Sequence, residues 1–133
     1  SRVLAADINI ESINYTRSLG IECIKSNLFC EVKEKFDIIV FNPPYLPRDN
    51  REDLESQQAT TGGKFGDETM IKFLKQASTH LKKHGRILLL LSTLTPRERI
   101  INELGKNRLS HKTIGKHKMF MESLEVWLIQ STQ

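Results

Sequence analysis

The residues best suited to chemistry are Asn42, Pro43, Pro44 and Tyr45, which directly follow the apolar run Phe36–Phe41. An amide or aromatic amine is a poor nucleophile because its nitrogen lone pair is delocalised into the neighbouring π system. The Asn42 side-chain oxygen and the Pro43 carbonyl can accept hydrogen bonds from both N–H groups of such an amine, which frees the lone pair. The prolines fix the backbone, and Tyr45 offers a flat surface for stacking. A rigid turn is the alternative interpretation, but a position directly after a buried strand favours the chemical one.

A second group of residues suits a nucleotide-like ligand. Asp7 ends the apolar run Val3–Ala6, and a carboxylate there can accept both hydroxyls of a ribose, although an acidic helix-start residue is equally common. Asn27 and Leu28 follow the next expected strand, where Asn27 would bind an adenine amine and Leu28 would pack on the ring. An ordinary loop asparagine is the alternative. We expect cofactor contacts from Asp7, Ile8, Asn27, Leu28 and Asn42.

The elements that must position these residues alternate between strand and helix. Short apolar runs predict strands at 3–6, 21–25, 36–41 and 86–91, and the end of the chain predicts two strands within 112–129, joined by a turn at 119–123. Asn9 can cap a helix over Ile10–Leu19 that Gly20 closes.

Two further helices are expected in the second half of the chain. The first helix is expected to begin at Asp67 and to end at Gly85. Its core face would comprise Ile71, Leu74, Ala77 and Leu81. Thr95-Pro96-Arg97-Glu98 predicts a capping box with proline in the first helical position. The core face of that helix would comprise Ile100, Ile101 and Leu104, with Gly105 as its end.

This order of elements predicts an α/β fold with a parallel sheet, helices on both faces and a C-terminal antiparallel hairpin. Ligands of such sheets bind outside the carboxyl ends of the strands. The polar residues that follow strands are therefore the ones to inspect: Asp7, Asn27, Asn42 and Ser92.

Composition limits the class of protein. The chain has 133 residues and a net charge of +4, which fits one domain over residues 1–133, and no apolar run approaches a membrane-spanning length. Cys23 and Cys30 form no C-x-x-C pair and have no histidines nearby, so we expect neither a disulfide nor a metal site, and a cytoplasmic location. The basic stretch His111–Lys118 indicates either a solvated hairpin or a contact patch.

Together these residues resemble the Rossmann-like S-adenosylmethionine methyltransferases that carry an N-P-P-Y motif. The likeness is strongest to the HemK-like release-factor glutamine methyltransferases, in their short archaeal and eukaryotic branch. It rests on Asp7, Asn27-Leu28-Phe29, Asn42-Pro43-Pro44-Tyr45 with Leu46-Pro47, Gly62-Gly63 and Gly66-Asp67-Glu68. It extends from Val3 to about Ile129.

The resemblance implies methyl transfer from S-adenosylmethionine to the glutamine of the Gly-Gly-Gln motif in a translation release factor. It also implies a small zinc-binding activator, which would add a strand at the sheet edge that carries Ile21, Cys23 and Ile24. An RNA amino methyltransferase and a degenerate, non-catalytic binding subunit are the alternatives.

Two departures from the family qualify the resemblance. The chain contains no G-x-G and begins where the second strand of the family would stand. We therefore expect the first strand and the Gly-rich loop to be missing from these residues. Asn27 stands where the family usually has aspartate.

We also expect the loop 46–65 to be mobile without substrate and to fold over the target peptide.

Overall fold

The computed structural model describes residues 1–43 and 66–132 and divides the chain into two units, Ser1–Glu34 and Lys35–Gln133. Each unit is described by itself. Pro44, Tyr45, Gly62, Gly63 and the rest of the loop 46–65 lie outside the described residues, as does the expectation that this loop is mobile.

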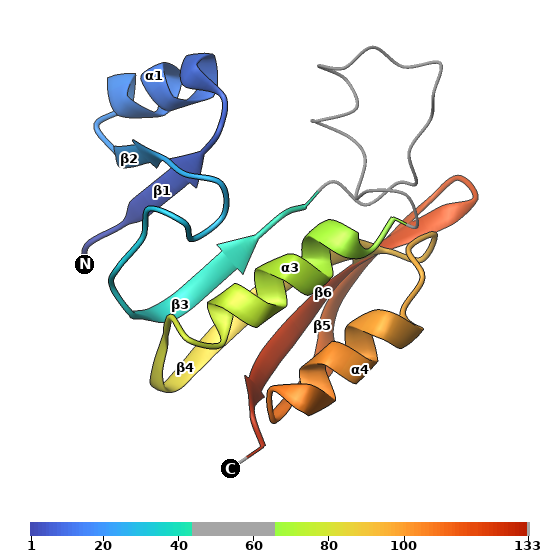
Figure 1. The fold of residues 1–133 in the computed structure, drawn as a ribbon. Helices are drawn as coiled ribbons and strands as arrows, with labels where there is room; N and C mark the ends of the chain where they lie inside the picture. Colours follow the sequence, from blue (N-terminus) through green and yellow to red (C-terminus); the bar gives the residue numbers. More distant parts are fainter. Residues whose placement is uncertain (44–65, 133) are drawn as a thin grey trace. The chain divides into compact units, whose positions relative to one another are not determined.

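The first unit is a strand–helix–strand unit (Figure 1). Strands β1 (Leu4–Asp7) and β2 (Glu22–Lys25) are parallel, and helix α1 (Ile10–Ser18) connects them. The Asn9 side-chain oxygen accepts hydrogen bonds from the Glu11 and Ser12 amides at 2.8 and 3.2 Å, so the predicted cap is confirmed. Gly20 follows the helix with a φ of 81°, a conformation that favours glycine.

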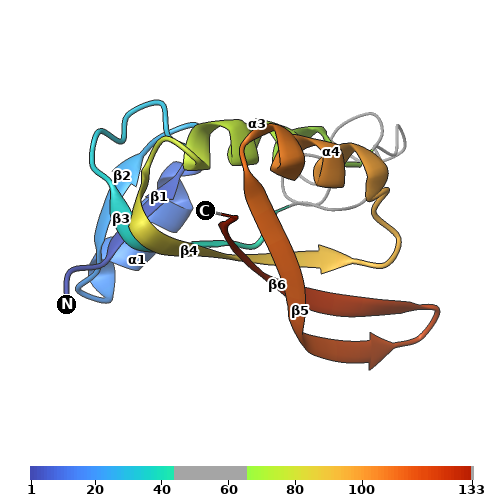
Figure 2. The same ribbon diagram turned by 90° about the horizontal axis from the view of Figure 1, so that it is seen from below.

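The second unit contains a four-stranded sheet in the order β3-β4-β6-β5. Strand β3 (Phe36–Phe41) is parallel to β4 (Leu81–Ser92), whereas β6 (Glu122–Ser131) is antiparallel to both β4 and β5 (Leu109–Met119). Helices α3 (Glu68–Ala77) and α4 (Glu98–Lys106) lie on the same face of this sheet (Figure 2). The mixed α/β architecture and the C-terminal hairpin agree with the sequence prediction.

The core of the second unit lies between this helix layer and the sheet. Alternate residues of β4 and β6 point toward the helices, as the period of a strand requires. The fully or almost fully buried side chains on this face and on the helices are Met70, Phe73, Leu74, Ala77, Ile87, Leu89, Leu91, Ile100, Leu104, Trp127 and Ile129.

The predicted end of helix α3 is wrong. The helix ends at Ala77, and Leu81 pairs with Phe36 as the first residue of β4. Gly85 lies buried within this strand, and a Cβ built there would lie 2.7 Å from the Leu81 side chain. Glycine at position 85 therefore allows close packing within the strand, and it does not end a helix. Ile71, predicted for the core face, is only half-buried.

The predicted limits of helix α4 are also wrong. Arg97 is the N-cap residue, so Thr95 does not cap the helix and Pro96 lies before it. The Thr95 amide instead donates to the Ser92 carbonyl at 3.0 Å and forms a turn. The helix continues past Gly105 to Lys106. Its buried face keeps Ile100 and Leu104 but exposes Ile101 and buries Glu103, whose carboxylate accepts a hydrogen bond from Asn107 at 2.8 Å.

The described residues, 1–43 and 66–132, were considered for membrane-spanning helices and for metal-binding clusters of side chains. No helix among them is long and apolar enough to cross a membrane. Within the same ranges, no group of three or more His, Cys, Asp or Glu side chains is arranged to hold a metal ion.

Candidate active site

Asp7 lies at the carboxyl end of β1, where its carboxylate is already oriented. One carboxylate oxygen accepts a hydrogen bond from the Asn9 amide at 3.0 Å, and the residue is half-buried. A carboxylate offers about four lone-pair sites, so this single bond leaves capacity for two ribose hydroxyls. The Asn9 contact fixes the side chain at the edge of the strand, and Ile8 beside it is 49% exposed.

The loop after β2 is built around Ser26, which is buried. The Ser26 hydroxyl donates to the Leu28 carbonyl at 2.8 Å and accepts from the Glu31 amide at 3.0 Å. These contacts hold Leu28 at a φ of 54°, a left-handed conformation that is costly for leucine. The Asn27 side chain is exposed at the start of this loop.

The structure brings the two parts of the expected nucleotide site together. Asp7 pairs with Lys25 in the parallel register, and the Ser26 amide donates to the Asp7 carbonyl at 2.9 Å. Asp7, Ile8, Asn27 and Leu28 therefore follow two adjacent strands at the same edge of the first unit.

Asn42 follows β3 in the second unit and is exposed, whereas Pro43 is buried. Phe41, one residue earlier, stacks on Phe73 of α3 with ring centroids 4.2 Å apart. This contact and the buried proline anchor the backbone on both sides of Asn42. The structure thus groups the predicted residues into two sets, one in each unit.

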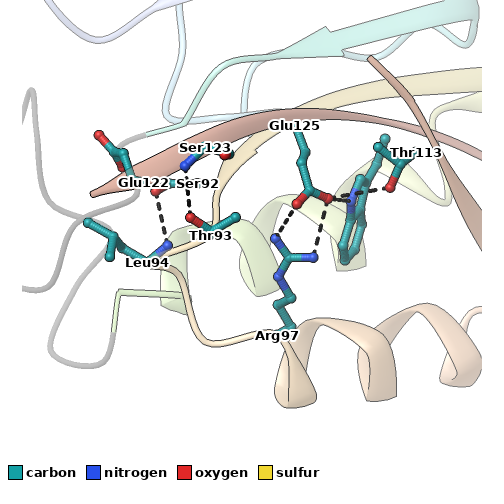
Figure 3. A network of polar contacts seen from close by, with 9 residues as sticks. Ser92, Thr93, Leu94, Arg97, Thr113, Glu122, Ser123 and Glu125 are labelled. Atoms are coloured by element: carbon teal, nitrogen blue, oxygen red, sulfur yellow. Dashed lines mark hydrogen bonds and ion pairs between the residues drawn. The ribbon is translucent and has the colours of Figure 1, made fainter. Parts of the chain in front are cut away.

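A polar network joins the carboxyl end of β4 to the start of β6 (Figure 3). The buried Ser92 hydroxyl donates to the Glu122 carboxylate and accepts from the Leu94 amide at 3.0 Å. The Thr93 amide donates to the Ser123 carbonyl, and the Ser123 amide donates to the Thr93 hydroxyl, both at 2.9 Å. These contacts lie at the same edge of the sheet as Asn42, because β3 and β4 are parallel neighbours.

A second network, around Glu125, fastens α4 to the hairpin (Figure 3). Arg97 donates two hydrogen bonds to the buried Glu125 carboxylate, at 2.8 and 3.3 Å, and the Trp127 indole donates another at 3.2 Å. The Arg97 guanidinium, as the main cause, lowers the pKa of Glu125 to about 2. His111 stacks on Trp127 at 3.9 Å, and burial lowers its pKa.

In each unit, sequence reasoning missed residues that organise the surroundings of the candidate site residues. Ser92 was recognised by its position after a strand, but its partner Glu122 is thirty residues away in the chain and no local pattern indicates the pair. Ser26 precedes the expected Asn27-Leu28 pair and carried no signal of its own. The Arg97–Glu125 pair likewise joins a helix start to a strand interior.

Several known proteins that are similar to this chain are named as methyltransferases. A provisionally named protein N5-glutamine methyltransferase of Methanocaldococcus jannaschii is 35% identical over 77% of this chain and 56% of its own length. The release factor glutamine methyltransferase of Streptococcus pneumoniae is 33% identical over 65% of this chain and 36% of its own length. The chain thus spans about half, or less, of these curated relatives. They confirm the resemblance to the HemK-like enzymes.

Solved structures confirm the Rossmann-like methyltransferase fold. The Encephalitozoon cuniculi structure described as an Mtq2–Trm112 complex aligns with a TM-score of 0.75, 20% identity and coverage of 98% of this chain and 72% of that chain. A ribosomal protein L11 methylase of Lactobacillus delbrueckii subsp. bulgaricus aligns with a TM-score of 0.67, 21% identity and coverage of 98% and 59%.

A family model covers most of the sequence. The model described as Eco57I restriction-modification methylase matches residues 5–126, a range that includes both sets of candidate site residues. The chain therefore belongs to this methylase family.

Proposed function

We propose that the protein containing this chain is an S-adenosylmethionine-dependent N-methyltransferase that modifies the glutamine of the Gly-Gly-Gln motif in a translation release factor. The observation that carries the proposal is the exposed Asn42, anchored after a buried strand by the Phe41–Phe73 stack and by buried Pro43. Relatives named as glutamine methyltransferases support this choice of substrate.

The residues of the first unit fit part of the cofactor. Asp7 has acceptor capacity for ribose hydroxyls, and the exposed Asn27 side chain can bind an adenine amine next to the apolar Leu28 and Ile8. Asparagine presents one amide oxygen where aspartate would present two, so we expect weaker adenine binding without loss of the contact. When bound, S-adenosylmethionine supplies a methyl group on a sulfonium, which is a strong electrophile.

In the second unit, the proposed role of Asn42 is to make the nitrogen of the glutamine amide a better nucleophile. Its side-chain oxygen and the Pro43 carbonyl would accept hydrogen bonds from the two N–H groups of the glutamine amide. This favours a tetrahedral nitrogen whose lone pair is available for attack. A strong general base is not needed, because the alkylated nitrogen loses its proton easily. Orientation supplies most of the rate.

Asn42→Ala tests this assignment. The acceptor matters chiefly as the nitrogen changes geometry, so we expect kcat to fall on the order of 100-fold or more. Cofactor affinity, measured by calorimetry, should stay within a few-fold, on the order of 1 kcal/mol at most. Unchanged turnover would remove Asn42 from the mechanism.

Methylation of a nucleic-acid amine is the second candidate. The observations that favour it are the description of the matching family as a restriction-modification methylase and fold neighbours such as an rRNA methylase of Streptococcus thermophilus, with a TM-score of 0.61 at 14% identity. An adenine or guanine amine needs the same pair of acceptors. Identification of the macromolecule that receives the methyl group separates the two candidates.

We also propose a small zinc-binding activator as a partner, docked along β2. Among the described residues β2 pairs only with β1, so its other edge is available for an added strand. The neighbouring structure described as a complex with Trm112 supports a two-subunit arrangement. Cys23 is buried and Ile21 precedes the strand, so the contact would rest on the β2 backbone and on Ile24.

A further inference from the structure

The tip of the β5–β6 hairpin exposes apolar side chains where a polar turn would be expected. Met119 pairs with Glu122, so Phe120 and Met121 form a two-residue loop. Phe120 is 91% exposed and Met121 is 82% exposed. Two-residue hairpin loops favour glycine and asparagine, so the turn does not call for phenylalanine or methionine.

Met121 also adopts a strained backbone conformation. Its φ is 63°, in the left-handed region that is unfavourable for a residue with a side chain. Glycine or asparagine would adopt this backbone conformation at lower cost, so the turn alone does not account for an exposed methionine at this position.

The tip has a fixed place relative to the candidate active site within the second unit. Ser92, the last residue of β4, pairs with Leu124, so residues 119–122 extend beyond the carboxyl edge of the sheet (Figure 1). The contacts of Glu122 with Ser92 and of Ser123 with Thr93 hold the base of the tip. Asn42 lies at the same edge, one strand beyond β4.

We propose that Met119, Phe120 and Met121 form a docking surface for the protein substrate, at a distance from the glutamine that is modified. This proposal rests on the proposed function. Exposed methionine and phenylalanine are typical of protein interfaces. The neighbouring His117 and Lys118 are exposed, so the matching site is an apolar pocket with an acidic rim. An apolar surface of this kind favours a protein partner over a nucleic acid. A nucleic acid would be bound by basic residues at its phosphates, and exposed methionines would add nothing to that contact.

The test uses the double variant Phe120→Asn/Met121→Gly in the protein as it is expressed naturally. Asn-Gly suits a two-residue hairpin loop, so the melting temperature should not fall. We expect KM for the intact release factor to rise about tenfold, the loss of one good apolar contact, with kcat within twofold. A short Gly-Gly-Gln peptide contains the motif to be methylated but not the docking surface, so its kcat/KM should not change. Ile101→Gln, at an exposed apolar position of α4, is the matched control and should behave as wild type.

Three results would overturn the proposal in distinguishable ways. An unchanged KM for the intact factor removes the tip from substrate docking while wild-type turnover still supports the proposed function. Loss of affinity for an RNA oligonucleotide, with the factor unaffected, assigns the tip to nucleic acid. If wild type methylates no release factor, the proposed function fails, and this docking assignment fails with it.

Discussion

Asn42 and Glu125 illustrate how differently two polar residues of the same unit are placed. Asn42 is exposed after a strand end, where its acceptor oxygen can meet a ligand. Glu125 is buried, and its carboxylate accepts hydrogen bonds from Arg97 and Trp127. The first arrangement suits a reacting group, and the second suits a structural one, because a buried charge must be paired.

Glu125 leads to a prediction about acid stability. Its pKa in the fold, about 2, is lower than the ordinary value of 4.5. The pair therefore stabilises the fold above about pH 4.5, and this contribution is lost as the pH falls toward 2. The lowered pKa of His111 acts in the same direction from pH 6.5 downward.

In Glu125→Gln, we expect the free energy of unfolding at pH 7 to fall on the order of 2 kcal/mol. It should also depend less on pH between 4.5 and 2 than it does in the wild type. Urea unfolding followed by fluorescence of Trp127, the single tryptophan, measures both. Parallel pH profiles for the two proteins would show that Glu125 does not carry the acid sensitivity.

At the scale of elements, the sequence predicted those helix and strand boundaries that depend on contacts between residues close together in the chain. Asn9 and Gly20 delimit α1 as expected, since both act through the backbone within a few residues. The boundary between α3 and β4 was misjudged because the role of Gly85 depends on packing against Leu81 and the Lys82 carbonyl. A sequence does not distinguish a glycine that is required because a side chain would not fit from a glycine that is required for a left-handed turn.

Gly85 and Gly105 of the second unit should respond in opposite ways to alanine. In Gly85→Ala the new Cβ would meet the Lys82 carbonyl oxygen at 2.8 Å, so we expect a loss of about 1–3 kcal/mol. In Gly105→Ala nothing lies within 4 Å, and the change within α4 should stabilise by up to about 1 kcal/mol. Denaturant titration of both variants measures the difference. Equal effects would contradict the packing role of Gly85.

At the scale of the whole molecule, the residues proposed to bind the cofactor and to act on the substrate are divided between the two units. Asp7 and Asn27 belong to the first unit, and Asn42 belongs to the second. The sequence indicated both groups because each follows a strand. The contacts that organise each group, such as Ser26 with Leu28 and Phe41 with Phe73, were not predictable, because they depend on how the loop and helix pack.

The proposed activator leads to a prediction at this scale. Ile24→Lys places a charge on the β2 surface, and we expect it to reduce co-purification with the small zinc-binding subunit at least severalfold. Ile21 is 37% exposed beside the strand, so Ile21→Lys should have a smaller effect. Tyr15→Lys, at a residue of α1 that is 67% exposed, is the control. Undiminished recovery with both isoleucine variants would exclude this edge as the interface.

The identity of the methyl acceptor tests the central claim most directly. The protein should be incubated with isotopically labelled S-adenosylmethionine, release factor and cellular RNA together, and the labelled product should be mapped by mass spectrometry. We predict label on the glutamine side chain of the Gly-Gly-Gln motif, and none when that glutamine is replaced by alanine. Label on an RNA base, or label on the factor that survives this replacement, would contradict the account.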